Sequence, residues 1–270
     1  ETPASELELK SVPILRVVPA KGLPVKRVDI YYSVDPDARS RFWRGAQAKQ
    51  NDNTWSAKLP LMDLNQPLFA FANVYYQLPK PAALPRNATS DEVCISSLFH
   101  EAKPATLKAA GVKAAGGPER VINDFKRGFH DWFTINGNHR PLWQHWTRKV
   151  TDPKWRGPKG AKLALTIQSD QPNVLGIVLH ENTWRHYRGK KRTYVAEVNL
   201  KGGKAETVTL DFGDFKNVTD GVLLKSWDEL DELGFVAKTT IRGAKPIELA
   251  AEPGQGPKPV FKRLEWQLED

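Results

Sequence analysis

The amino-acid sequence predicts an all-β fold with two sandwich domains in tandem. Short runs rich in Val, Ile, Tyr, Phe and Trp recur along the chain, bounded by Pro, Gly, Asn and Asp, which is the pattern of strands and turns. These runs lack the intervening helical segments that a parallel βαβ sheet requires. At 270 residues the chain has room for two domains of ordinary size.

The first half, residues 9–80, has the strand spacing of an immunoglobulin-like sandwich. Its run at residues 28–34 alternates in part and stops at Asp35-Pro36-Asp37, a turn signal. We expect its strands near residues 13–18, 25–34, 54–60 and 68–78.

Residues 81–118 are expected to link the two domains. Prolines make the start of this segment extended connector material. The stretch 104–111 predicts one short helix that begins at Pro104 and ends at Gly111. The Gly-Gly-Pro sequence that ends at Pro118 marks the boundary of the second domain.

The second half, residues 119–270, has the strand count of a jelly roll made of two antiparallel sheets. A helical turn is expected at residues 227–233, before one of its strands. The expected strands lie near residues 121–125, 145–151, 162–168, 173–180, 192–200, 205–210, 233–240 and 263–268.

Composition and chain ends narrow the class of protein. Hydrophobic residues make up 40% and charged residues 26%, which is typical of a folded globular chain. No apolar run reaches the roughly 18–20 residues of a membrane span, so no membrane span is predicted. The start, Glu1-Thr2-Pro3-Ala4, lacks the features of a signal peptide, and we expect the chain to be cut from a longer protein.

The single cysteine, Cys94, lies in an apolar context and is expected to be a small buried residue. One cysteine excludes an internal disulfide and a Cys-rich zinc site. Scarcity of cysteine suits a protein that avoids stray oxidation, so we expect a secreted location, periplasmic or extracellular.

Motifs of common enzymes are missing from the sequence. There is no Gly-x-Ser-x-Gly elbow, no phosphate-binding Gly-rich loop and no His-Glu-x-x-His pair. Glu181 with Asp228 or Asp231 is a conceivable acid/base pair, although a solvated acidic face is the commoner use of such residues. We therefore predict that the chain is not an enzyme.

Residues 31–44, followed by Trp55 and the aromatic run at 69–76, resemble the C-terminal sandwich of a group of secreted α/β-hydrolases. The group comprises the PhoPQ-activated pathogenicity-related type and its dienelactone-hydrolase-like relatives. Arg39 and Phe42 carry the likeness to its Ala-Arg-x-x-Phe turn. The resemblance implies a catalytic domain N-terminal to Glu1, as a partner within the same polypeptide.

The second half resembles galactose-binding-like sandwiches, which include many carbohydrate-binding modules. The likeness is carried by Asn123-Asp124-Phe125 with Trp132, by residues 226–235 and by the closing Leu264-Glu265-Trp266. It implies a sugar ligand. No cofactor is expected otherwise, but such sandwiches often hold a structural calcium ion. By their position, Asp124 and Glu269 or Asp270 are the candidate ligands.

Tryptophans suggest where a sugar binds, because sugar rings stack on exposed aromatic rings. Trp155 and Trp184 lie among polar residues and are expected to be exposed. The tryptophans within apolar patterns are expected in the core; these are Trp132, Trp146, Trp227 and Trp266.

The stretch 184–192 combines Trp184 and Tyr187 with five cations, a composition that suits a uronate or a sulfated sugar. A solvated hairpin tip and single-stranded nucleic acid are the alternatives. The acidic stretch 228–232 argues against nucleic acid as a partner. The candidate ligand-binding residues are Trp184, Tyr187, Arg185, Arg188, Trp155, Glu181 and Asn182.

These observations predict a non-catalytic accessory region that binds polysaccharide, with anionic polymers included, and targets or supports a secreted hydrolase. An enzyme with its site in the jelly roll, built on Glu181, His180 and Tyr187, is one alternative. A purely structural pair of sandwiches is the other.

Overall fold

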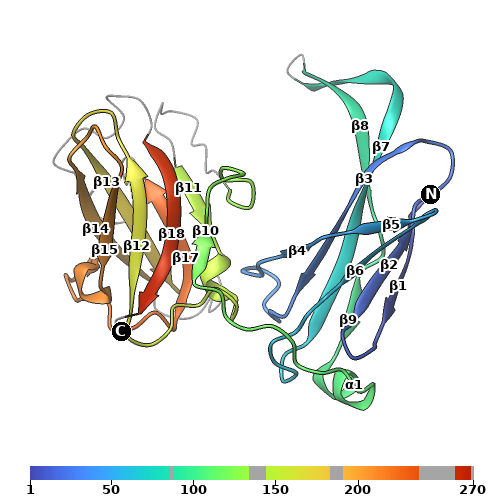
Figure 1. The fold of residues 1–270 in the computed structure, drawn as a ribbon, viewed down its shortest axis with the longest axis horizontal. Helices are drawn as coiled ribbons and strands as arrows, with labels where there is room; N and C mark the ends of the chain where they lie inside the picture. The colour runs from blue at the N-terminus through green and yellow to red at the C-terminus, as the bar shows by residue number, and fades with distance from the viewer. Residues whose placement is uncertain (86–87, 134–143, 183–190, 237–258, 269–270) are drawn as a thin grey trace. The chain divides into compact units, whose positions relative to one another are not determined.

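The computed structural model describes residues 1–85, 88–133, 144–182, 191–236 and 259–268 (Figure 1). The chain divides into two compact units, Glu1–Gly117 and Pro118–Asp270. Both units are built from antiparallel sheets, which confirms the all-β prediction. Within the described residues, no helix has the length and apolarity that a membrane crossing requires.

Unit 1 is a sandwich of two sheets with the immunoglobulin topology. Lettered A to G in chain order with one C′ strand, the sheets have the orders A-B-E-D and C′-C-F-G. Sheet A contains β1 (Ala4–Glu8), β2 (Ile14–Val18), β6 (Thr54–Lys58) and β5 (Lys49–Asn51). Sheet B contains β4 (Arg44–Ala46), β3 (Val25–Ser33), β7 (Leu68–Leu84) and β8 (Ala88–Ser96), and β9 (His100–Ala102) pairs with β7.

Alternation along the strands explains the core of unit 1. Leu15 and Val17 of sheet A meet Ile30, Ala72 and Val74 of sheet B, and all five are buried. Successive side chains of a strand point to opposite faces, so the residues between them face outward. The core is thus the shared inner face of the two sheets.

The segment predicted to be a linker is largely part of unit 1, which corrects that prediction. β7 continues through its prolines to Leu84, and β8 and β9 follow it in the same sheet. The register of β7 against β8 shifts between Gln77 and Ala82, so an irregularity accommodates the prolines. The predicted helix is confirmed as α1 (Pro104–Ala109), whose Leu107 is buried in the core.

Cys94 is exposed, so the prediction of a buried thiol is wrong. It lies on β8 directly opposite Tyr75 of β7, which faces outward. The neighbours Val93 and Ile95 pack against the core instead. The period of two places the central residue of this apolar triplet on the outer face.

Unit 2 is a jelly roll. Numbered 1 to 8 in chain order without the two-residue β16, its strands have the orders 1-8-3-6 and 2-7-4-5. Sheet C contains β10 (Val121–Asn123), β18 (Val260–Leu268), β12 (Ala161–Gln168) and β15 (Glu206–Leu210). Sheet D contains β11 (Gln144–Thr147), β17 (Leu230–Val236), β13 (Asn173–Glu181), β14 (Arg192–Leu200) and β16 (Lys216–Asn217); the short helices are η2 (Lys149–Thr151) and η3 (Phe212–Asp214).

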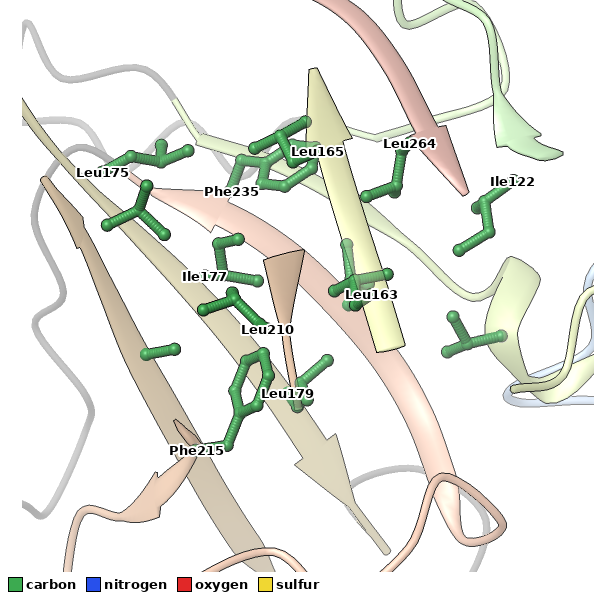
Figure 2. Close-up of a cluster of buried hydrophobic side chains, with 14 of the residues drawn as sticks. Ile122, Leu163, Leu165, Leu175, Ile177, Leu179, Leu210, Phe215, Phe235 and Leu264 are labelled. Carbon is green, nitrogen blue, oxygen red and sulfur yellow. The ribbon is translucent and has the colours of Figure 1, made fainter. Parts of the chain in front are cut away.

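The core of unit 2 lies between sheets C and D. Figure 2 shows Leu163 and Leu165 of β12 pointing toward Ile177 and Leu179 of β13. The four tryptophans predicted to be core residues are 1% to 8% exposed, which confirms that prediction. The helical turn expected at residues 227–233 is wrong, because β17 already begins at Leu230.

Candidate functional site

Four of the predicted ligand-binding residues, Trp184, Arg185, Tyr187 and Arg188, lie outside the described residues, as does Asp270. The strands on either side are described. β13 ends at Glu181 and β14 begins at Arg192, and these two residues pair directly. The predicted sugar platform at 184–188 stays a prediction.

Trp155 is buried, so its predicted exposure is wrong. It is 8% exposed, and the ammonium groups of Lys149 and Lys154 lie 4.9 and 4.8 Å from its ring centroid. Its carbonyl accepts a hydrogen bond of 2.9 Å from Nε1 of the core residue Trp266. With its ring buried, Trp155 offers no stacking surface to a sugar.

Glu181 is buried on the inner face of sheet D. The hydroxyl of the core residue Tyr194 donates to its Oε2 at 3.1 Å, and a nitrogen of Arg192 lies 3.9 Å away. Burial raises the pKa of the Glu181 carboxyl, although the Tyr194 hydrogen bond and Arg192 act in the opposite direction. Asn182 has a left-handed φ of 55° after the end of β13, a conformation that Asn tolerates better than most residues.

Asp124 is exposed and interacts with its own turn. Its Oδ1 accepts from the backbone N–H of Lys126 at 3.2 Å, and that hydrogen bond is the main cause of its lowered pKa. No group of three or more His, Cys, Asp or Glu side chains within the described ranges is arranged to hold a metal ion. The calcium expectation stays a prediction.

A polar and aromatic cluster lies on the outer face of sheet D, and we name it the sheet D cluster. It consists of Trp146, Arg148, His180 and Glu232. β11, β17 and β13 are neighbours in the sheet, so Trp146, Glu232 and His180 come from three adjacent strands. The apolar residues Val178 and Val236 pack beside them.

Trp146 lies flat against the backbone of β17 because its partner there is Gly234. A Cβ atom at Gly234 would come within 2.3 Å of the Cε3 atom of the indole ring. The same ring is 5.0 Å from that of His180, at an interplanar angle of 30°. Its Nε1 donates to Oε1 of Gln144 at 3.1 Å, which fixes the ring in its plane.

Glu232 joins the two basic residues of the cluster. His180 Nδ1 is 3.0 Å from Oε2 of Glu232, and Arg148 Nε donates to Oε1 at 3.3 Å. The Glu232 side chain is 2% exposed, whereas His180 and Arg148 are 16% and 23% exposed. A buried carboxylate requires such partners, and in return it fixes the orientation of two groups that reach solvent.

His180 and Glu181 are consecutive residues of β13, so their side chains lie on opposite faces of sheet D. The enzyme alternative built on both residues is therefore not supported by the arrangement. Glu232 is not evident from the sequence, because residues 228–232 have the composition of a solvated acidic stretch. Leu233 and Phe235 alternate with Glu232 and Gly234, and that period of two was the available signal.

Comparisons with known proteins place the chain in no family. No family model matches it, and no curated protein matches it. A solved chain described as glycoside hydrolase family 32 from Bifidobacterium adolescentis aligns at 9% identity with a TM-score of 0.20. The alignment covers 98% of this chain and 41% of that one, and at this TM-score the likeness carries no argument.

Proposed function

We propose that this chain is a non-catalytic accessory region that binds polysaccharide outside the cytoplasm and serves a secreted hydrolase. The observation that carries the proposal is the sheet D cluster. It presents an imidazole and a guanidinium that are oriented by one buried carboxylate, and the buried ring of Trp146 packs beside the imidazole. A small number of well-oriented polar groups fixes a sugar in its binding site.

Each side chain of the cluster has a distinct part in such binding. His180 uses Nδ1 on Glu232, and no described residue hydrogen-bonds to its Nε2, which points to a sugar hydroxyl as partner. Arg148 uses Nε on Glu232, and a guanidinium is a cation that suits the carboxylate of a uronate or a sulfate. Trp146 is 6% exposed, so its ring packs beside the imidazole of His180 and holds it in place rather than stacking on the sugar.

The test is titration calorimetry of the full chain against polygalacturonate and against a neutral xylan. Arg148→Gln should lower the affinity for polygalacturonate at least about tenfold, because a charge-assisted hydrogen bond is lost. The affinity for xylan should fall less, and added salt should weaken only the binding of the anionic polymer. His180→Ala should weaken the binding of both polymers.

Two matched variants control for folding and charge. Arg148→Lys keeps the charge beside Glu232 but loses the planar fork, so stability should hold while binding of the anionic polymer falls. His130→Ala removes an exposed histidine of the same unit and should change neither. If the wild-type chain binds neither polymer, the structural alternative holds and the proposal fails.

An enzyme remains the second candidate, since a histidine hydrogen-bonded to a carboxylate is also the orientation of a general base. It would use Glu232 rather than Glu181 as the partner of His180. Turnover of a polysaccharide that His180→Ala abolishes, with the fold intact, would favour this candidate over the accessory region.

A further inference from the structure

Unit 1 has a cluster of aromatic rings on the outer face of sheet B, in which Phe69 is 6% exposed and the other rings reach solvent to a greater extent. We name it the sheet B aromatic face; it consists of Tyr31, Trp43, Phe69, Phe71 and Phe99, with Arg41 among the rings. The register places Tyr31 of β3 opposite Phe71 of β7. The adjoining Phe99 and Leu98 are 53% and 65% exposed, and both are large hydrophobic side chains.

The rings contact one another both edge-on and stacked: Tyr31 is stacked on Phe71 at 5.4 Å and 27°. Trp43 meets Phe71 at 4.8 Å and 88°, and meets Phe99 at 6.1 Å and 86°. Phe69 and Phe99 are stacked at 5.8 Å and 26°. A sugar stacks on an open ring face, whereas here Trp43 stands edge-on to Phe71 and Phe99, and Tyr31 is stacked on Phe71, so the cluster does not suit a glycan. Interlocking rings with an arginine are instead the composition of a protein interface.

Arg41 supplies the charge of this face. Its guanidinium carbon lies 3.7 Å from the ring centroid of Phe69, and its Nε donates to the carbonyl of Asp35 at 2.7 Å. Among the described residues it forms no ion pair with a carboxylate. Burial lowers the pKa of Arg41, although the carboxylates of Asp35, Glu101 and Asp37 act in the opposite direction.

An exposed carboxylate lies on the same face. Glu101 of β9 is the register partner of Phe69, the residue on which Arg41 stacks. A face with adjacent positive and negative groups disfavours a polyanion. It has the charges of a self-complementary interface, however, because a two-fold axis that runs between the two residues would bring each Arg41 to the Glu101 of the other copy.

We propose that the sheet B aromatic face pairs with the same face of a second copy of this chain, forming a two-fold symmetric dimer. Phe99 and Leu98 fill the centre of the interface, and two reciprocal Arg41–Glu101 pairs flank them. Burial of the rings drives the association, and the charged pairs set its symmetry.

Sedimentation velocity of the full chain over a range of concentrations tests this proposal. The wild-type chain should show a concentration-dependent equilibrium of monomer and dimer. Phe99→Asp should shift it to monomer by at least about tenfold in Kd, because a charge is placed in the apolar centre. Leu84→Asp is the matched control: Leu84 is 47% exposed and lies outside this face, so the equilibrium should not change.

Charge reversal tests the symmetry. Arg41→Glu and Glu101→Arg should each weaken the dimer, and the double variant should restore it, because each position then meets its opposite again. A wild-type chain that stays monomeric at every concentration overturns the proposal and leaves this face to a different partner. A dimer that survives Phe99→Asp overturns it as well. Polysaccharide binding by unit 2 is measured separately, so that either proposal can fail alone.

Discussion

At the scale of single residues, one step along β13 separates two environments. His180 reaches solvent on the outer face, whereas the neighbouring Glu181 is enclosed with Tyr194 on the inner face. Burial therefore acts on the Glu181 carboxyl without being fully offset by a cation, and its pKa is raised. A raised carboxyl pKa means that the folded chain holds a proton that the unfolded chain releases.

This proton has a consequence for stability. Between the ordinary glutamate pKa and the raised one, the folded state binds more protons, so its stability falls as the pH rises through that window. In the variant Glu181→Gln the side chain does not titrate, and its amide oxygen still accepts the hydrogen bond from the Tyr194 hydroxyl. When unfolding in urea is measured between about pH 4 and pH 8, the free energy of unfolding should therefore fall more steeply with pH for the wild type than for Glu181→Gln. Parallel curves would mean that Glu181 does not titrate as described.

Residue environments could be predicted from the sequence where the local pattern decides them. Trp132, Trp146, Trp227 and Trp266 lie in apolar patterns and are buried. Trp155 has a polar neighbourhood with prolines and glycines, yet its burial is decided by contacts far along the chain, such as that with Trp266. The pattern of residues around Trp155 in the sequence does not indicate such a contact.

At the scale of elements, alternation and turn signals predicted the long strands within a few residues, but not the short edge strands. β4, β5 and β9 have three residues each, too few to show a period. β8 was missed because its sequence is polar on one face and because the prolines before it indicated a connector. The sheet D cluster was missed for a related reason: it depends on which strands become neighbours.

The packing of Trp146 on Gly234 gives a prediction at this scale. Gly234→Ala places a methyl group against the indole ring, and β17 is hydrogen-bonded to strands on both sides, so the ring must move. Overpacking of this kind costs about 1–3 kcal/mol of unfolding free energy. Gly213→Ala is the control, since a Cβ there meets nothing within 4 Å. Equal unfolding free energies for the two variants, measured in urea, would contradict this account of the packing.

At the scale of the whole molecule, each unit has its own hydrophobic core. The core of unit 1 includes Leu107 of α1, so the helix belongs to that unit. The core of unit 2 begins at Ile122 of β10. The boundary between Gly117 and Pro118 falls in the predicted Gly-Gly-Pro segment, because glycine and proline interrupt both strand and helix there.

Separate cores predict separate folding. Residues 1–117 and 118–270, expressed apart, should each unfold cooperatively in urea, and their circular dichroism spectra should add up to that of the full chain. A fragment of residues 1–80, which ends where the sequence placed the first domain, should fail to fold because it lacks β8, β9 and α1. A stable 1–80 fragment would show that these elements are dispensable.

Cys94 is a natural site for attaching a single spectroscopic label. It is the only thiol in the sequence, it is exposed, and it lies on the same outward face of sheet B as Tyr75 and Phe71. A maleimide-linked nitroxide or fluorophore therefore attaches at one defined point without any substitution. Double electron–electron resonance between two nitroxide labels then gives the distance between the Cys94 positions of two associated copies. The mobility of the label reports whether that face is covered.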